Sequence, residues 1–254
     1  MKPVRLSDYE EGRPFNGDYD EALKQIQKCL GHIQVAHIVH KQRAVIAIEG
    51  WDAAGKGGII QRLTAGWDPR GFEVWPIGAP NGIEKEQHFL QRFWAGLPTD
   101  GEISVFDRTW YGRVLVERVE GFASEAEWRR AYAEINAFER TQLAEGTTFI
   151  KLFVHVTQAV QDKRLRERLD HPWKRWKIGP DDFRNRARRA DYLDAMHDMF
   201  DRADLPWIVI DGNDKKAARI AALTAIAEAL EQGVDMTPPR PDEAVERLGK
   251  AIFG

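Results

Sequence analysis

The stretch AVIAIEGWDAAGKGGIIQRL, residues 44–63, decides the fold. Its first part, Ala44–Glu49, is a short run of apolar and β-branched residues, which predicts a buried strand. Gly50–Lys56 then matches the spacing G-x-x-x-x-G-K, and the apolar residues Ile59 and Leu63 that follow are spaced as on one face of a helix. A strand, a glycine-rich loop and a helix in this order predict a phosphate-binding loop.

The chemistry of this loop suits an anion. Glycines let the backbone curl so that successive N–H groups point at one phosphate, the helix N-terminus adds its positive dipole end, and Lys56 supplies a mobile positive charge. A glycine-rich turn without function is the alternative, and the flanking strand and helix make it the weaker interpretation. The predicted phosphate-binding residues are Ala53, Ala54, Gly55, Lys56, Gly57 and Gly58.

Gly57 departs from the usual pattern, in which Ser or Thr places a hydroxyl on Mg²⁺. Another group must then hold the metal. Asp52 in the loop and Asp107 at the end of a second apolar run are the candidates, because both are expected at the carboxyl edge of the sheet. Strand-end aspartates also cap helices, so Asp52 alone is a weak indication. The prediction is Mg²⁺, with Mn²⁺ as the alternative, on Asp52 and Asp107.

Four further apolar runs complete the expected sheet. Their alternation with helical patterns predicts parallel strands with helices on both faces, a three-layer α/β/α fold of the P-loop kinase type with five strands and a helical lid. The strands are predicted at Phe72–Pro76, Ile103–Asp107, Phe149–Val156 and Trp207–Asp211. The helices are predicted at Tyr19–His40, at Ser124–Glu145 with a capping-box pair of Ser124 and Glu127, and at Asp214–Glu231.

The chain divides into three parts around this core. Residues 1–43 are predicted as an N-terminal extension whose helix packs on the core, residues 44–236 as the P-loop domain with a lid at about 158–190, and residues 237–254 as a C-terminal tail. The sequence TPPRP at the start of the tail ends the last helix, and the tail is expected to dock either on the body or on a neighbouring subunit. No apolar run is long enough for a membrane span, so the expected location is the cytoplasm.

A second polar segment, Asp107–Arg113, follows a predicted strand and combines a carboxylate with two guanidinium groups. In phosphoryl transfer, charge spreads over the oxygens of the moving group, and a well-placed arginine contributes on the order of 10³-fold in rate. The alternative is structural, with Asp107 paired to an arginine and Arg113 paired to Glu117 on a helix face.

Positive charge is concentrated between residues 163 and 189, which hold eleven Lys and Arg against four Asp and Glu on a chain whose net charge is −3. Such a concentration repels itself unless an anion neutralises it, which predicts a lid over phosphates. A solvated helical face with paired charges is the alternative, although the segment holds too few acids to pair every cation. Trp173 and Trp176 are predicted to pack the lid against the body.

These motifs together resemble the polyphosphate kinase 2 family over about residues 44–229. Two positions depart from the family's pattern: His171 stands where an acid usually precedes the lid proline, and Asn81-Gly82 stands where the family often has threonine. The matching segments are GWDAAGKGG (50–58), FDRTWYGRVLVERVEGF (106–122), FERTQLAEGT (138–147), HPWKRWK (171–177) and NDKKAAR (213–219).

The resemblance implies a reversible, Mg²⁺-dependent transfer of phosphoryl groups between inorganic polyphosphate and a nucleotide, converting ADP to ATP or AMP to ADP, with guanine nucleotides as further candidates. It implies a homodimer or homotetramer, and neither a nucleic acid nor a membrane as partner. The residues implied in catalysis are Asp52, Lys56, Asp107, Arg108, Arg113 and Glu117. The residues implied in contacts to polyphosphate are Arg164, Arg168, Lys174 and Lys177.

Two other functions fit part of the same pattern. An ATP-dependent nucleoside or nucleotide kinase shares the phosphate loop and an Asp-Arg segment near its acceptor. A non-catalytic polyanion-binding protein would keep the basic segment but would have no need of Lys56 or Asp107.

Overall fold

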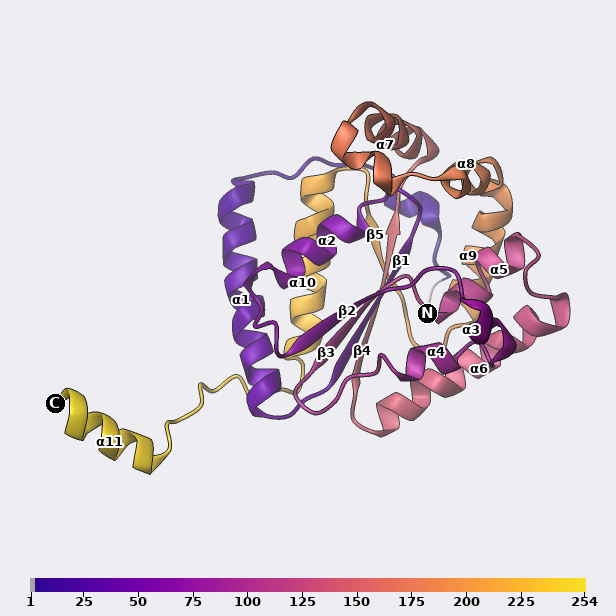
Figure 1. The fold of residues 1–254 in the computed structure, drawn as a ribbon. Coiled ribbons are helices and arrows are strands. Elements are labelled where there is room, and N and C mark those ends of the chain that lie inside the picture. Colours follow the sequence, from indigo (N-terminus) through magenta and orange to yellow (C-terminus); the bar gives the residue numbers. More distant parts are fainter. Residues whose placement is uncertain (1–2) are drawn as a thin grey trace.

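A five-stranded parallel sheet forms the middle of the structure, a computed structural model that describes residues 3–254 (Figure 1). The strand order is β2-β3-β1-β4-β5, and every neighbouring pair is parallel. The five predicted strands are confirmed to within one residue at each end. Their bounds are β1 Ala44–Gly50, β2 Phe72–Pro76, β3 Ile103–Asp107, β4 Thr148–His155 and β5 Ile208–Asp211.

Helices cover both faces of the sheet, so the predicted three-layer α/β/α arrangement is confirmed (Figure 1). Parallel strands need both faces covered, because the crossover helices lie on them. One face carries α1 Tyr19–Val39, α2 Lys56–Leu63 and α10 Lys215–Glu231. The other face carries α4 Gln91–Trp94, α5 Val116–Val119, α6 Glu125–Ala144 and α9 Arg189–Arg202.

Caps and short turns define the ends of these helices. The Ser124–Glu127 capping box is present at the start of α6, where the Ser124 backbone N–H donates to Glu127 Oε2 at 2.7 Å. Asp214 caps α10 by accepting from the Ala217 N–H at 2.7 Å. The remaining short elements are η1 Leu6–Tyr9, η2 Thr64–Gly66, α3 Gly82–Glu86 and η3 Trp110–Arg113.

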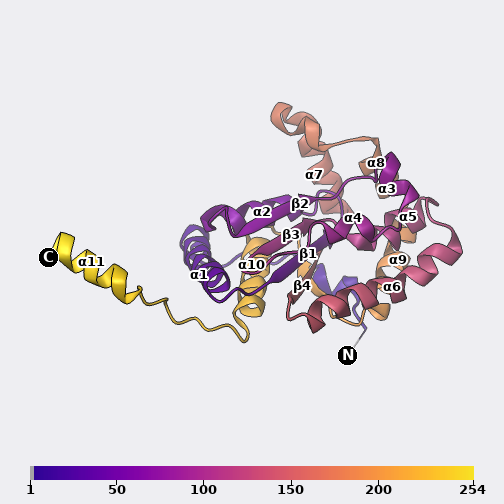
Figure 2. The ribbon, with the colours of Figure 1, turned by 60° about the horizontal axis from the view of Figure 1, so that its bottom comes forward.

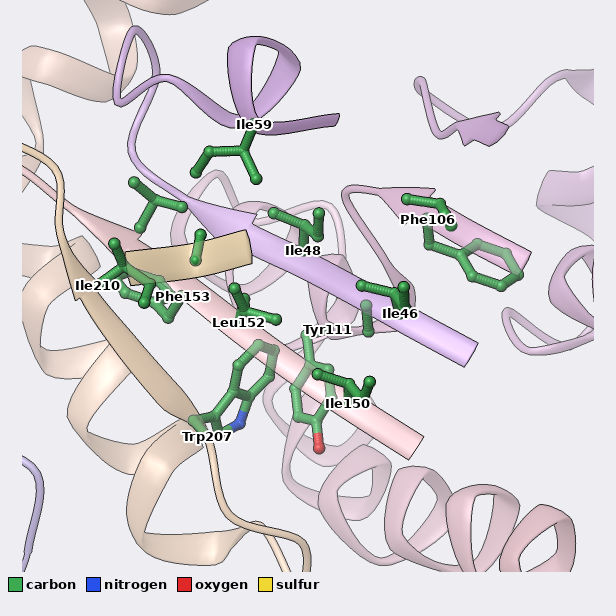
Figure 3. Close-up of a cluster of buried hydrophobic side chains, with 14 of the residues drawn as sticks. Ile46, Ile48, Ile59, Phe106, Tyr111, Ile150, Leu152, Phe153, Trp207 and Ile210 are labelled. Atoms are coloured by element: carbon green, nitrogen blue, oxygen red, sulfur yellow. The ribbon is translucent and has the colours of Figure 1, made fainter. Parts of the chain in front are cut away.

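The core is centred on β1 and β4, whose side chains are buried on both faces of the sheet. Figure 3 shows Ile46 and Ile48 of β1 packed beside Ile150 and Leu152 of β4. Both β1 isoleucines are fully buried, and each such side chain stabilises the fold by about 1.5–3 kcal/mol relative to exposure. This packing fixes the carboxyl ends of the central strands, where the phosphate loop begins.

The basic segment folds as α7 Gln158–Asp170, the turn η4 Pro172–Lys177 and α8 Pro180–Ala187, beyond the carboxyl ends of the strands (Figure 1). The prediction that Trp173 and Trp176 pack this lid against the body is wrong. Their exposed fractions are 85% and 78%, because the turn that carries them packs on α7 rather than on the sheet layers.

The C-terminal helix α11, Glu243–Phe253, stands away from the body in both views (Figures 1 and 2). No residue of α11 is buried, and its apolar residues Val245, Leu248, Ile252 and Phe253 are exposed. Docking on the body, one of the two expectations for the tail, is therefore not seen. Across residues 3–254, no helix combines the length and the apolar composition needed to cross a membrane.

Candidate active site

The phosphate loop curls between β1 and α2 because several of its residues take left-handed backbone conformations. Gly50 has φ 142°, and a Cβ atom placed there would lie 2.3 Å from the Val154 carbonyl oxygen, so only glycine fits. Gly55 has φ 119°, and Ala53, which is not glycine, has φ 61°. A left-handed alanine costs about 1–2 kcal/mol and is kept only where the surroundings enforce it.

Lys56 begins α2 and points back across this loop. Its Nζ donates to the carbonyl oxygens of Gly50 at 2.7 Å and Trp51 at 3.1 Å. Burial, together with the positive charge of Arg108, lowers the pKa of Lys56. Within residues 3–254 the amine hydrogen-bonds to neutral carbonyl oxygens and has no ion pair with a carboxylate.

Asp52 is held from two sides by hydrogen bonds. Its Oδ1 accepts from Arg108 Nη2 at 2.8 Å, and its Oδ2 accepts from Asn185 Nδ2 of the lid at 3.0 Å. Burial alone would raise the pKa of Asp52, but the charges of Lys56 and Arg108 outweigh burial and hold that pKa below its ordinary value. Asp52 is thus an ionised carboxylate that joins the loop to the Arg108 segment and to the lid. The contact with Asn185 was not predicted, since no sequence pattern marks it.

Asp107 ends β3 next to β1, where it pairs in register with Ile48. Among residues 3–254, its carboxylate has no hydrogen bond or ion pair, in contrast to that of Asp52. The same range contains no cluster of three or more His, Cys, Asp or Glu residues that could hold a metal. One open carboxylate near a second, at the end of the sheet, fits Mg²⁺, which usually binds one or two carboxylates and completes its shell with substrate phosphates and water.

Arg113 and Glu117 form the ion pair that was the structural alternative for them. Arg113 Nη1 lies 3.2 Å from Glu117 Oε2, and the guanidinium stacks 4.8 Å from the Phe89 ring centroid. Burial raises the pKa of Glu117 despite this pairing. Arg113 also lines a cavity of about 310 Å³ together with Gln87, His88, Phe89, Glu127, Arg130 and Glu134. A catalytic role for Arg113 and Glu117 stays a prediction.

A buried ion pair lies beneath the Asp107–Arg113 segment. Lys151 Nζ donates to Glu139 Oε2 at 2.8 Å and to the Tyr111 hydroxyl at 2.7 Å, and Trp110 Nε1 donates to Glu139 Oε1 at 3.0 Å. Both charged side chains are 1% exposed. Two consecutive aromatic residues of the segment are thereby fixed to β4 and α6.

Arg164, predicted from the resemblance to contact polyphosphate, lies beneath the phosphate loop. Its guanidinium is buried beneath the phosphate loop and donates to the carbonyl oxygens of Ala53 at 3.2 Å, Ala54 at 2.7 Å, Gly212 at 2.6 Å and Asn213 at 3.1 Å. With its donors directed at four carbonyl oxygens, Arg164 supports the shape of the loop from below, and its contact to polyphosphate stays a prediction.

The other predicted lid residues remain near the surface. Arg168 donates to the Lys177 carbonyl oxygen at 3.0 Å and lies 3.7 Å from Asp182, while the Lys177 amine lies 4.9 Å from the Trp176 ring centroid. Lys174 is exposed. Their contacts to polyphosphate stay predictions.

Acids from neighbouring elements neutralise part of the basic segment. Arg184 pairs with Glu120 at 2.9 Å, and Arg186 pairs with Asp162 at 2.7 Å. A count of charges between residues 163 and 189 misses these partners, because Glu120 and Asp162 lie outside that range. Five exposed cations of the segment have no ion pair with any residue in 3–254: Lys163, Arg166, Lys174, Arg175 and Lys177.

A second cavity adjoins the phosphate loop on the side of α10. Its volume is about 310 Å³, and it is lined by the loop glycines Gly55 and Gly58 together with Lys215 and Arg219 of α10. The two cations belong to the NDKKAAR segment, to which the sequence assigned no role. Residues of the phosphate loop and two positively charged residues of α10 thus line one space.

Comparison with known proteins gives consistent matches. The model of the family described as Polyphosphate kinase 2 (PPK2) matches residues 15–237. A polyphosphate:AMP phosphotransferase of Pseudomonas syringae pv. tomato is 48% identical over 76% of this chain and 39% of its own length. One of Acinetobacter johnsonii is 44% identical over 92% of this chain and 49% of its own length. This chain thus spans less than half of either relative.

A solved structure shares the whole fold. The crystal structure of polyphosphate kinase 2 from Arthrobacter aurescens TC1 superposes with a TM-score of 0.89 at 32% identity, covering 99% of this chain and 94% of that one.

Proposed function

We propose, since this chain belongs to the polyphosphate kinase 2 family, that it transfers a phosphoryl group between inorganic polyphosphate and a nucleoside mono- or diphosphate. The observation that carries the proposal is the juxtaposition of a phosphate loop, its Lys56 amine, and the carboxylates of Asp52 and Asp107 at one edge of the sheet. AMP is the favoured acceptor, because the two relatives are named for it.

In this mechanism the chain positions phosphates and stabilises their charge. The amides of the loop and the Lys56 amine hold the transferring phosphates, and Arg108, held by Asp52, stabilises the charge that develops on their oxygens. Asp107 and Asp52 would hold Mg²⁺, or Mn²⁺, which supplies Lewis-acid neutralisation of phosphate charge when bound. Loop, arginine and carboxylates therefore act by placement and charge rather than by covalent chemistry.

Polyphosphate, rather than a single nucleotide, suits the charge of the lid. The five exposed cations without an ion pair lie on one segment, and a long anion with about one charge per phosphate can neutralise several of them together. We also propose the homodimer or homotetramer that the resemblance implies, with the exposed Val35, Ile38 and Val39 of α1 in the interface. Small-angle scattering that gives a monomer would exclude this assembly.

The test of the function is an incubation of the purified protein with Mg²⁺, long-chain polyphosphate and either AMP or ADP, without ATP. We expect ADP from AMP, or ATP from ADP, measured by chromatography. Product formed only when ATP is the donor would favour the ATP-dependent kinase instead. Polyphosphate binding without turnover under either condition would favour a non-catalytic polyanion-binding protein.

We expect the cavity beside α10 to receive the distal part of the polyphosphate chain. Replacing Lys215 and Arg219 together with alanine should raise the KM for long-chain polyphosphate by about tenfold, which corresponds to ~1.4 kcal/mol. The kcat and the KM for nucleotide should stay unchanged. Lys216→Ala is the matched control, because the Lys216 amine stacks 5.0 Å from the Tyr19 ring instead of lining the cavity. If the double variant and Lys216→Ala raise the KM for polyphosphate equally, the polyphosphate chain does not bind in this cavity.

A further inference from the structure

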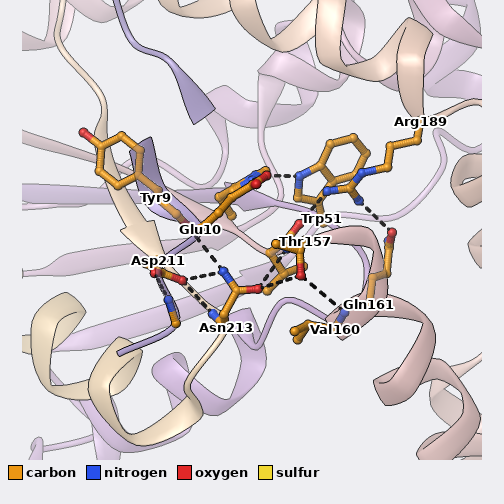
Figure 4. A network of polar contacts seen from close by, with 12 residues as sticks. Tyr9, Glu10, Trp51, Thr157, Val160, Gln161, Arg189, Asp211 and Asn213 are labelled. Carbon is orange, nitrogen blue, oxygen red and sulfur yellow. Dashed lines mark hydrogen bonds and ion pairs between the residues drawn. The ribbon is translucent and has the colours of Figure 1, made fainter. Parts of the chain in front are cut away.

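We infer that Glu10 is a positioning residue for the phosphate loop, acting through His155 and Trp51. Glu10 lies outside residues 15–237, to which the family model extends, so the inference concerns a part of the chain beyond the family match. The inference rests on one part of the proposed function, namely that the loop holds phosphates. Figure 4 shows the network of polar contacts around Glu10 and Trp51.

The chain of hydrogen bonds has one direction. The indole Nε1–H of Trp51 donates to His155 Nδ1 at 2.9 Å, and indole nitrogen is a donor only, so Nδ1 carries no proton. The ring proton therefore lies on Nε2, which donates to Glu10 Oε1 at 3.0 Å. His155 is 0% exposed, and burial lowers its pKa, which keeps the ring neutral. Glu10 thus selects the tautomer that accepts from Trp51.

Trp51 is also held by an arginine stacked on the face of its ring. The Arg189 guanidinium of α9 stacks 3.9 Å from the Trp51 ring centroid, and its Nη1 donates to Gln161 Oε1 at 2.9 Å. Gln161 Nε2 in turn donates to the Asp52 carbonyl oxygen at 3.1 Å. A change in the position of the indole therefore reaches the backbone of Asp52, next to Trp51 in the loop.

Glu10 can be altered without releasing the segment that carries it. Leu6 is 2% exposed and belongs to the core, the Gly12 N–H donates to Asp211 Oδ2 at 2.7 Å, and Asn213 Nδ2 donates to the Tyr9 carbonyl oxygen at 3.4 Å. The Glu10 carboxylate pairs with His155 and takes part in none of these contacts. Loss of the carboxylate leaves His155 Nε2–H without its acceptor, and the other tautomer would set an N–H against the indole N–H.

The first experiment compares Glu10→Ala with two variants. We expect Glu10→Ala to lower kcat/KM for polyphosphate about tenfold, since small misplacements of binding groups carry large kinetic costs. It should also speed amide hydrogen exchange in residues 51–58. Glu10→Gln, whose amide oxygen still accepts from His155, should retain near wild-type behaviour. Glu11→Ala is the control, because Glu11 is exposed and pairs with Arg13.

The second experiment tests the route through Trp51. In a Trp51→Phe background, which keeps an aromatic ring and removes the indole N–H, Glu10→Ala should cause no further change in exchange at residues 51–58. Equal effects of Glu10→Ala and Glu11→Ala, or an undiminished effect of Glu10→Ala in this background, would overturn the inference. Hydrogen exchange needs no turnover, so it remains decisive even if the wild-type chain transfers no phosphate and the proposed function fails.

Discussion

Replacing Asp107 with asparagine is expected to lower kcat by on the order of 10²- to 10³-fold in the polyphosphate assay at saturating Mg²⁺. The substitution keeps the shape of the side chain and removes its charge. Within residues 3–254 the Asp107 carboxylate has no hydrogen-bond or ion-pair partner, so the fold does not depend on that charge. The loss should appear in turnover and in a higher Mg²⁺ requirement, with an unchanged thermal unfolding midpoint.

Glu73→Gln is a suitable control for this variant, because Glu73 lies exposed on the neighbouring strand β2 and away from the loop. Glu73→Gln and Asp107→Asn each remove one carboxylate, so the two variants have the same net charge. A kcat for Asp107→Asn similar to that of the control would remove Asp107 from the metal site. A fall in the unfolding midpoint would instead show that the carboxylate stabilises the fold.

Replacing Lys151 with methionine is expected to destabilise the protein by about 3–5 kcal/mol. Methionine fills a similar volume but leaves the Glu139 carboxylate buried without its cation. The Trp110 indole N–H would still donate to that carboxylate. Burial lowers the pKa of Lys151, which shows that the amine is itself costly to bury and is retained through its pairing with Glu139. Urea unfolding of the wild-type and variant proteins measures the difference.

The double variant Lys151→Met/Glu139→Gln separates lost pairing from lost packing. It removes both charges, and the glutamine amide oxygen still accepts from Trp110. Replacing both members of a buried ion pair is often neutral, so the double variant should recover most of the stability lost in Lys151→Met. If the double variant is as unstable as the single one, the cost comes from packing and the electrostatic explanation is wrong.

Much of the fold could be predicted because its signals are local. The strand at Ala44–Gly50, the loop after it and the capping box at Ser124 are each written in a few consecutive residues, and the structure places each of them as expected. Asp52 and Asp107 reach the same edge of the sheet because parallel strands β1 and β3 pair in register. Position at a strand end was enough to predict that shared edge.

The features that could not be predicted depend on contacts between residues that lie far apart in the sequence. Charge counting treats every cation alike, so it could not tell that Arg164 lies under the loop while Lys174 is exposed. The prediction for Trp173 and Trp176 was wrong for a related reason. An aromatic residue in the sequence does not indicate which surface its side chain will contact. The pairing of Glu10 with His155 joins residues from opposite halves of the chain, and no local pattern could reveal it.

The position of β1 in the middle of the sheet also determines the order in which a growing chain can complete the phosphate loop. Ile48 pairs with Asp107 on one side and with Leu152 on the other, and the Trp51 N–H donates to the Val154 carbonyl oxygen at 3.3 Å. Each of these partners is synthesised long after β1. Such non-local pairings form slowly, and a nascent chain cannot close the back of the loop until β4 has left the ribosome. The segment with the strongest sequence signal thus depends for its final shape on strands that follow it much later in the chain.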